Sequence, residues 1–211
     1  MKALLFDLDG TLLDTQDLIL NSFRFAYAKV LGDETPPSDD YFMSLVGIPL
    51  KTQMEMISPE HGQELFEAYL DHNANKHDSM VSDFEGTEEA LAALKSKGVR
   101  MAVVTSKRHG TAVRGLEQTG LMEYFEFLLG ADDTAKHKPL PDPLLDAAAI
   151  MEIDPLECAY VGDSPYDMQS ARAANMYAVG ALWGMFSEES LLEGGAEVLL
   201  STISELPGLV D

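Results

Sequence analysis

The amino-acid sequence predicts an α/β protein built on a doubly wound parallel sheet, with an all-helical domain inserted near its start. Three observations predict this class. A short buried-strand run opens the chain, a long stretch with only helical spacing follows, and from about Ser82 strand-like runs alternate with helical segments. We therefore expect an α/β core in residues 1–14 and 82–211 and a helical domain in residues 15–81. A chain of 211 residues is long enough for such a core with one insertion.

The spacing of apolar residues predicts the first elements in chain order. KALLF (2–6) is expected to form the first strand, and DETPPSDD (33–40) a loop inside the insertion. On the first helix, Leu18, Phe25 and Ala28 are expected to share one face, with Ile19, Ser22 and Phe23 nearby. The predicted helices of the insertion span 18–31, 49–57 and 62–77.

After Ser82, helices and strands alternate to the end of the chain. Thr87 is a plausible N-cap for the next helix, and Gly98 is expected to end it. The predicted strands span 99–105, 125–130, 158–163, 176–182 and 196–201, and the predicted helices span 87–98, 109–119, 142–151, 165–174 and 187–193. Ligands bind outside the carboxyl ends of the strands in open parallel sheets. A helical insertion after the first strand is therefore expected to lie over the site as a lid.

Composition excludes several function classes. With 36 Asp and Glu against 14 Lys and Arg, the net charge of −22 repels nucleic acid and anionic membranes, so neither is expected as a partner. A single cysteine, Cys158, excludes an intrachain disulfide and fits a reducing compartment. Asp7 and Asp9 interrupt the first apolar run, so no signal peptide is expected, nor is a membrane span of about 18 apolar residues. A cytoplasmic protein is expected.

Polar side chains follow four of the predicted strands and are expected to meet at one edge of the sheet. They are Asp7, Asp9 and Gly10 after the first, Thr105 and Ser106 after the second, Lys138 after the third, and Asp163 and Asp167 after the fourth. Clustered carboxylates stay ionised only around a cation, and oxygen ligands without a histidine or cysteine cluster favour Mg²⁺. The five histidines show no such cluster and are expected on the surface. Hydroxyl, backbone N–H and lysine donors suit a phosphoryl group.

The same four motifs resemble a known family. FDLDGTLLDT, VVTSK, KHKPLPDP and YVGDSPYD are similar, in this order and at suitable spacing, to the four signatures of the haloacid dehalogenase (HAD) superfamily of phosphohydrolases. The resemblance covers nearly the whole chain and implies a Rossmann-like core with a C1 cap domain. The TSK segment and the KPLPDP segment are most similar to those of phosphoglycolate phosphatases and related pyrophosphatases. It implies a Mg²⁺-dependent phosphatase that hydrolyses a small phosphorylated metabolite, either a phosphoglycolate-like phosphomonoester or pyrophosphate, through an aspartyl phosphate.

The resemblance implies roles for the first aspartates. Asp7 would attack phosphorus, and Asp9 would protonate the leaving oxygen and then activate water. Such a division of labour suits two carboxylates in different environments. Mg²⁺ would be held by the Asp7 carboxylate, the Asp9 main-chain carbonyl and Asp163, and Gly10 permits the turn after the strand.

The remaining motif residues are assigned to the phosphoryl group. The resemblance implies that Thr105 and Lys138 hold its non-reacting oxygens, with the Ser106 main chain nearby, and that Asp167 orients Lys138 or a metal-bound water. Two readings from the residues stay open: Ser106 is also a candidate helix N-cap, and Lys136 is a rival to Lys138.

Substrate choice is expected to depend on the insertion. LVGIPLKTQ (45–53) resembles the loop that family members lower toward the site. Lys51 is either a contact for a second anionic group of the substrate or a lone surface lysine. A monomer and a homodimer both remain open.

Two alternatives to a phosphatase are considered. A sugar phosphomutase of the same fold would return the phosphoryl group to its product. A non-catalytic signalling or binding module, such as a receiver, also uses an aspartate, Mg²⁺, a hydroxyl and a lysine. Receivers place the aspartate after an internal strand and carry no cap of this size, so the complete set of motifs favours the phosphatase.

Overall fold

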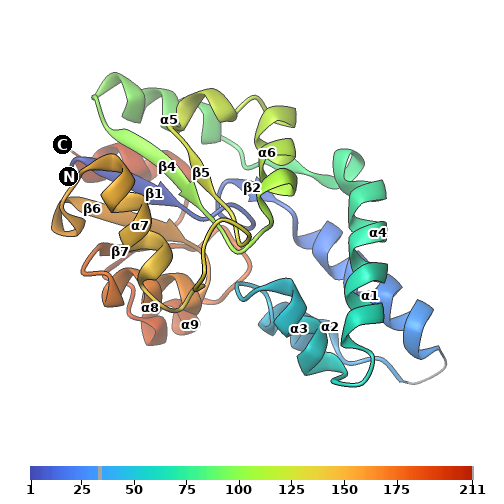
Figure 1. Ribbon diagram of the computed structural model, residues 1–211. Coiled ribbons are helices and arrows are strands. Elements are labelled where there is room, and N and C mark those ends of the chain that lie inside the picture. The colour runs from blue at the N-terminus through green and yellow to red at the C-terminus, as the bar shows by residue number, and fades with distance from the viewer. Residues whose placement is uncertain (33–34, 211) are drawn as a thin grey trace.

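The computed structural model describes residues 1–32 and 35–210 of the chain. In these residues, six parallel strands form a sheet in the order β5-β4-β1-β6-β7-β8 (Figure 1). The strands are β1 Ala3–Phe6, β4 Arg100–Val104, β5 Leu128–Leu129, β6 Cys158–Gly162, β7 Tyr177–Ala181 and β8 Val198–Leu200. β1 is central, with Ala3 opposite both Arg100 of β4 and Cys158 of β6. Strands added on both sides of the first confirm the doubly wound α/β fold.

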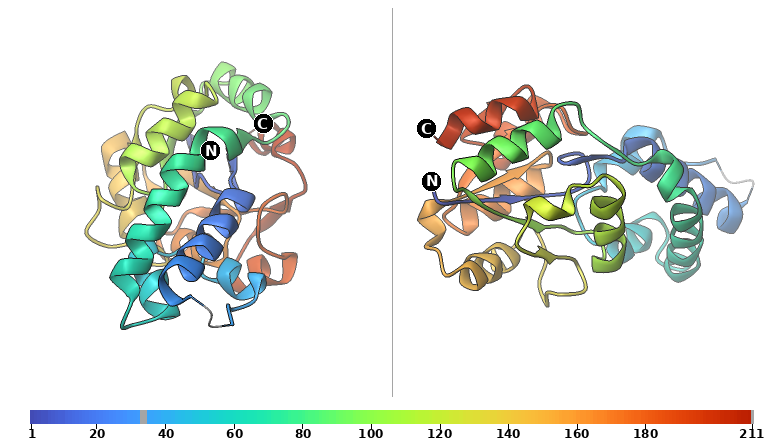
Figure 2. Two further views of the ribbon diagram at one scale, coloured as in Figure 1. Left: turned by 90° about the vertical axis from the view of Figure 1, so that its right-hand side faces the viewer. Right: turned by 90° about the horizontal axis from the view of Figure 1, so that it is seen from above.

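Helices cover both faces of the sheet. Successive side chains of β1 point to opposite faces and are apolar on both, so both faces are buried by packing against helices. Leu4 and Phe6 pack in one apolar cluster, and Leu5 packs in another. Helices α5 (Thr87–Ser96) and α6 (His109–Gln118) and the 3-10 helix η3 (Ile203–Val210) contribute to the first cluster. Helices α7 (Asp142–Met151), α8 (Pro165–Ala173) and α9 (Glu188–Gly194) contribute to the second, on the other side of the sheet (Figure 1, Figure 2).

The helical insertion lies beyond the carboxyl end of β1 and has an apolar cluster of its own (Figure 1). It consists of α1 (Gln16–Leu31), α2 (Asp39–Ser44), α3 (Leu50–Ile57) and α4 (Gly62–Met80). Helices α1 and α4 run side by side (Figure 2). In its core, the ring of Phe23 stacks on that of Phe42, with 5.2 Å between the ring centroids. It also meets the ring of Tyr69 edge-on, again with 5.2 Å between the centroids. Such aromatic pairs stabilise the helical part independently of the sheet.

A second, two-stranded sheet connects the two parts. β2 (Leu13–Asp14) leads into the insertion and pairs antiparallel with β3 (Ser82–Asp83), which leads out of it. The chain therefore enters and leaves the insertion at neighbouring points. Strands of two residues carry no periodic signal, so the sequence did not predict this pair.

The structure corrects the predicted face of the first helix. Its buried residues are Leu18, Ile19, Ser22, Phe23, Ala26 and Tyr27. Phe25 is 38% exposed and stacks on His72 of α4, and Ala28 is exposed. The buried stripe is wider and rotated, because the helix packs against both α4 and α2.

Three local predictions are also wrong. Thr87 is the first residue of α5, and its N-cap is Gly86, in a left-handed conformation. The strand predicted at 125–130 pairs only at Leu128 and Leu129, opposite Val103 and Val104. His77 is fully buried rather than at the surface. Gly98 does end α5, with φ at +77°.

The loop predicted at 33–40 begins at residues 33–34, which lie outside the described residues. Its last part behaves as expected, because the side chain of Ser38 accepts a hydrogen bond from Tyr41 N and caps α2. Among the helices of the described residues, none combines the length and the apolar character that a membrane span requires.

Candidate active site

The carboxyl ends of the central strands bring an aspartate and a lysine together beneath the insertion. Asp7 directly follows β1 and is buried, and its Oδ1 lies 3.0 Å from Nζ of Lys138. The same nitrogen lies 2.6 Å from Oδ1 of Asp167 and 3.0 Å from the hydroxyl of Tyr160. Residues up to 160 positions apart in the sequence thus converge because parallel strands end at one edge.

Lys138 is held by charge as well as by hydrogen bonds. Burial alone would lower its pKa, but the carboxylates of Asp167 and Asp7 outweigh that effect and raise the pKa above its usual range. Lys138 is therefore a fixed cation. Its sequence rival, Lys136, is exposed and pairs with Asp142 at 2.7 Å. The structure brings Lys138, and not Lys136, to the aspartates.

Asp163 follows β6 and faces the turn after β1. Its Oδ2 accepts a hydrogen bond of 2.7 Å from Met185 N. A Cβ on Gly10, which has φ at +77°, would lie 2.1 Å from the same oxygen. The close approach of these two segments therefore requires glycine at position 10.

Three buried carboxylates form a compact group of oxygen donors. Oxygens of Asp7, Asp163 and Asp167 lie within 4.8 Å of one another. Burial raises the pKa of Asp7 to about 6, although Lys138 opposes the shift. Burial, with the charges of Asp167 and Asp7, raises the pKa of Asp163 well above its usual range. Hard oxygen donors that repel one another fit a divalent cation such as Mg²⁺.

Both oxygens of Asp167 are engaged, as are those of Asp163, whose Oδ1 accepts a 3.4 Å hydrogen bond from the hydroxyl of Thr11. In Asp167, Oδ1 accepts from Lys138, and Oδ2 accepts from Ser164 N at 3.0 Å and from Ser164 Oγ at 2.6 Å. Ser164 in turn caps α8, which begins at Pro165. This arrangement fixes Asp167 between Lys138 and the first turn of α8.

Thr105 and Ser106 follow β4 at the same edge. Thr105 is buried, and its hydroxyl accepts a hydrogen bond of 3.2 Å from Lys107 N. Ser106 does not cap the next helix, because the N-cap of α6 is Arg108. Its hydroxyl instead donates a 2.8 Å hydrogen bond to the carbonyl oxygen of Gly47 in the insertion. This bond connects the sheet edge to the loop above it.

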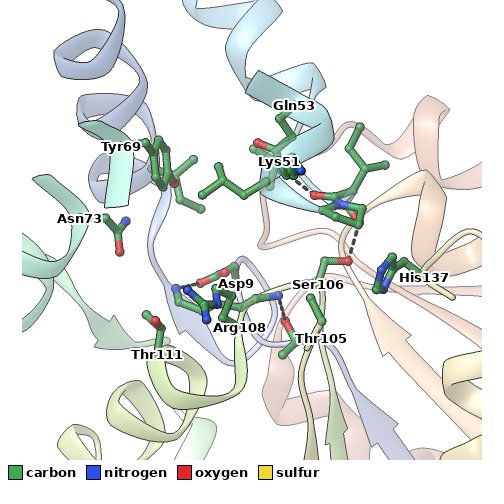
Figure 3. Close-up of a pocket in the computed structure, with 18 of the residues that line it drawn as sticks. Asp9, Lys51, Gln53, Tyr69, Asn73, Thr105, Ser106, Arg108, Thr111 and His137 are labelled. Atoms are coloured by element: carbon green, nitrogen blue, oxygen red, sulfur yellow. Dashed lines mark hydrogen bonds and ion pairs between the residues drawn. The ribbon is translucent and has the colours of Figure 1, made fainter. Parts of the chain in front are cut away.

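A cavity of about 260 Å³ lies between the sheet edge and the insertion (Figure 3). Asp7, Asp9, Thr105 and Asp163 line it from the core. Residues of the insertion line it from the opposite side and include Gly47, Lys51, Gln53, Tyr69 and Asn73. Lys51 is exposed and borders this cavity.

The sequence analysis assigned no functional role to several residues that line the cavity. Nζ of Lys107 lies 2.7 Å from Oδ1 of Asp9, and both side chains are largely buried. Burial, followed by the charge of Asp9, raises the pKa of Tyr69 on α4, which places this phenol in the field of the aspartate. Arg108 and Asn73 also line the cavity. For Lys107 the available signal was its place directly after Thr105 and Ser106.

Comparisons with known proteins agree with this geometry. The family model of the haloacid dehalogenase-like hydrolases matches residues 4–181. The "Putative pyrophosphatase PpaX" of Caldanaerobacter subterraneus subsp. tengcongensis is 41% identical over 193 residues, which cover 90% of this chain and 86% of that protein. The "Pyrophosphatase PpaX" of Bacillus pumilus is 30% identical over 210 residues, which cover 100% of this chain and 96% of that protein.

A solved structure shares the fold. A haloacid dehalogenase-like family hydrolase from Streptococcus pneumoniae superposes with a TM-score of 0.89 at 23% sequence identity, covering 100% of this chain and 99% of that chain.

Proposed function

Because the chain belongs to the haloacid dehalogenase-like hydrolase family, as its four motifs predicted, we propose that it is a Mg²⁺-dependent phosphatase for small phosphorylated substrates. One observation carries the proposal. A buried aspartate, Asp7, lies at the floor of a cavity, 3.0 Å from a fixed lysine, Lys138, and close to a second buried carboxylate, Asp163. This combination provides a nucleophile together with positive charge for the group that is transferred.

The reaction would proceed in two displacements. A carboxylate oxygen of Asp7 attacks phosphorus, the bond between phosphorus and the leaving oxygen breaks, and Asp9 gives its proton to that oxygen. Asp9 then accepts a proton from water, whose oxygen attacks the aspartyl phosphate and releases inorganic phosphate and the Asp7 carboxylate. Asp9 lines the same cavity as Asp7, which supports its role as the acid and base.

The other motif residues would hold the phosphoryl group in place. Thr105, the Ser106 main chain and Lys138 would bind its non-reacting oxygens, and Asp167 would fix Lys138 through their 2.6 Å contact. Such preorganised donors are usually the main catalytic contribution in phosphoryl transfer.

Mg²⁺, when bound, supplies positive charge that neutralises the transferring group. The Asp7 carboxylate, the Asp9 main-chain carbonyl and Asp163 would hold it, and the crowding of buried carboxylate oxygens within 4.8 Å supports this set. Gly10 would serve it indirectly, because only glycine allows the turn after β1 to approach Asp163.

We further propose that residues 15–81 act as a cap domain on a core of residues 1–14 and 82–211. The cavity of about 260 Å³ between the two suits a small substrate. The similarity to proteins named pyrophosphatase favours pyrophosphate, and a phosphoglycolate-like monoester remains within the proposed class. Lys51 would contact the part of the substrate farthest from Asp7.

A steady-state assay tests the proposal. With Mg²⁺ present, phosphate release is measured from pyrophosphate, 2-phosphoglycolate and p-nitrophenyl phosphate. Asp7→Asn is expected to abolish turnover. Asp14→Asn is the matched control, because Asp14 is an exposed aspartate on β2, and it is expected to retain turnover. Turnover that survives in Asp7→Asn but is lost in Asp14→Asn would overturn the assignment.

A further inference from the structure

The ion pair between Lys107 and Asp9 has no part in the mechanism above. Nζ of Lys107 lies 2.7 Å from Oδ1 of Asp9, with side-chain exposures of 10% and 17%. An exposed lysine pair is weak and mobile, whereas this ammonium group is enclosed by the cavity wall. The protein has a net charge of −22, so a lysine enclosed in the wall of a ligand cavity gives that cavity a local positive charge that most of the protein lacks.

The position of Lys107 relative to the leaving group follows from the proposed role of Asp9. A general acid must lie within about 3 Å of the oxygen that it protonates. The leaving oxygen therefore binds next to the Asp9 carboxylate, and the Lys107 ammonium contacts that same carboxylate. Whatever is attached to the leaving oxygen thus lies within reach of Lys107.

Lys107 has donors left for such a ligand. A lysine ammonium carries three N–H donors. In the part of the chain that the structure describes, Asp9 is its one side-chain partner, so two donors can turn to a ligand without loss of the ion pair. Arg108, the next residue, lines the same cavity (Figure 3) and adds a second positive charge; its side chain is 58% exposed, and its Nε lies 3.7 Å from Oδ2 of Asp132.

We propose that Lys107, assisted by Arg108, forms a leaving-group subsite that selects substrates whose leaving group is itself a phosphate. This inference rests on the proposed phosphatase function and narrows its substrate class to phosphoanhydrides such as inorganic pyrophosphate. The departing phosphate carries more negative charge than an alcohol or a phenol. Two positive side chains beside it stabilise that charge as the bond to the transferred group breaks, and they give a smaller gain to p-nitrophenolate, which carries a single delocalised charge.

The test compares two substrates in one set of variants. Lys107→Gln is expected to lower kcat/KM for Mg²⁺-pyrophosphate by about 30- to 100-fold, the factor for loss of a charge-assisted hydrogen bond. For p-nitrophenyl phosphate, the loss is expected to stay several-fold smaller. Lys107→Arg should restore part of the pyrophosphate activity, because it restores the charge. Lys136→Gln is the control, since Lys136 also pairs with an aspartate at 2.7 Å but outside the cavity.

The possible outcomes separate this inference from the proposed function. Equal losses on both substrates would mean that Lys107 only positions Asp9, and would overturn the subsite. A wild-type enzyme that hydrolyses the aryl phosphate but not pyrophosphate would also overturn it and would leave the phosphatase proposal in place. No turnover of any phosphorylated substrate would overturn both. Thermal unfolding of Lys107→Gln, expected near that of wild type, checks that the variant folds.

Discussion

The Nζ atom of Lys138 lies 2.6 Å from Oδ1 of Asp167, and neither side chain is more than 2% exposed. Asp167 is fixed from its other side by Ser164, which caps the same helix. The pair therefore holds one lysine in a single orientation, with its ammonium group also beside Asp7. A buried charge of this kind is stable only while its partners remain.

Removal of the lysine is expected to destabilise the fold. Lys138→Met leaves buried aspartates without their cation, and we expect the free energy of unfolding to fall by about 3 kcal/mol. Urea denaturation measures this change. Lys136→Met removes an exposed lysine from a pair of similar length and should cost under about 1 kcal/mol. Similar losses in both variants would show that Lys138 has no special structural role.

Removal of one carboxylate is expected to separate metal binding from folding. Asp163→Asn relieves the repulsion within the group of Asp7, Asp163 and Asp167, so without Mg²⁺ the variant should melt at a higher temperature than wild type. Mg²⁺ should raise the melting temperature of wild type, because it binds only the folded state, and should have little effect on the variant. An equal rise in both proteins would place the ion elsewhere.

The loop above the site is expected to depend on Gly47. Its φ is +103°, and a Cβ there would lie 2.8 Å from Tyr166 Cδ2 and 3.1 Å from Ser164 Oγ. Gly47→Ala should push the loop off the core and raise KM about 10-fold by weakening the hydrogen bond from Ser106.

Gly98→Ala is the control for the Gly47 variant. Gly98 also has a positive φ, of +77°, but nothing within 4 Å of its Cβ position. Both variants should lose a similar amount of stability, about 1 kcal/mol, from backbone strain. An unchanged KM in Gly47→Ala would show that the loop contact does not matter for substrate binding.

His77 on α4 is expected to make stability dependent on pH. Burial lowers its pKa, with Lys107 and Arg114 acting in the same direction and Asp78 opposing them. Folding therefore favours the neutral ring. Its stabilising effect is complete above the pKa of an unfolded histidine, about 6.5, and is lost as the pH falls below that value.

Urea unfolding at pH 7.5 and pH 5.5 measures the effect of His77. Wild type should lose more stability over this interval than His77→Leu, in which no ring titrates. The carboxylates outside this region contribute equally to both proteins. A larger loss in the variant would mean that the buried ring is stabilised in its charged form.

Much of the fold was predictable because its signals are local. Each core strand is a short apolar run, four of these runs are followed by polar motifs, and the six strands occur in the described residues where such runs were found. Lys138 could be preferred over Lys136 only through the family motif, since both are lysines in one loop. The strand at 125–130 was overestimated, because its pairing depends on the end of β4 rather than on its own residues.

The rest of the site required tertiary information. Tyr69 and Asn73 reach the cavity from α4, and nothing in their spacing distinguishes a cavity face from a packed face. His77 is polar, yet it is fully buried, and its ring lies near Gly115 of α6, a contact that nothing in the sequence indicates. Lys107 follows a recognised motif, but its contact with Asp9 joins residues 98 positions apart.

The neighbouring entry and exit of the insertion, at β2 and β3, have an evolutionary consequence. Because the chain departs and returns at paired strands, residues can be gained, lost or exchanged between them without a change in the spacing of the large sheet. The core residues that we propose for the chemistry and the insertion residues that line the cavity can therefore diversify at different rates. New specificities would then arise by changes in the insertion as well as at Lys107 and Arg108 of the core.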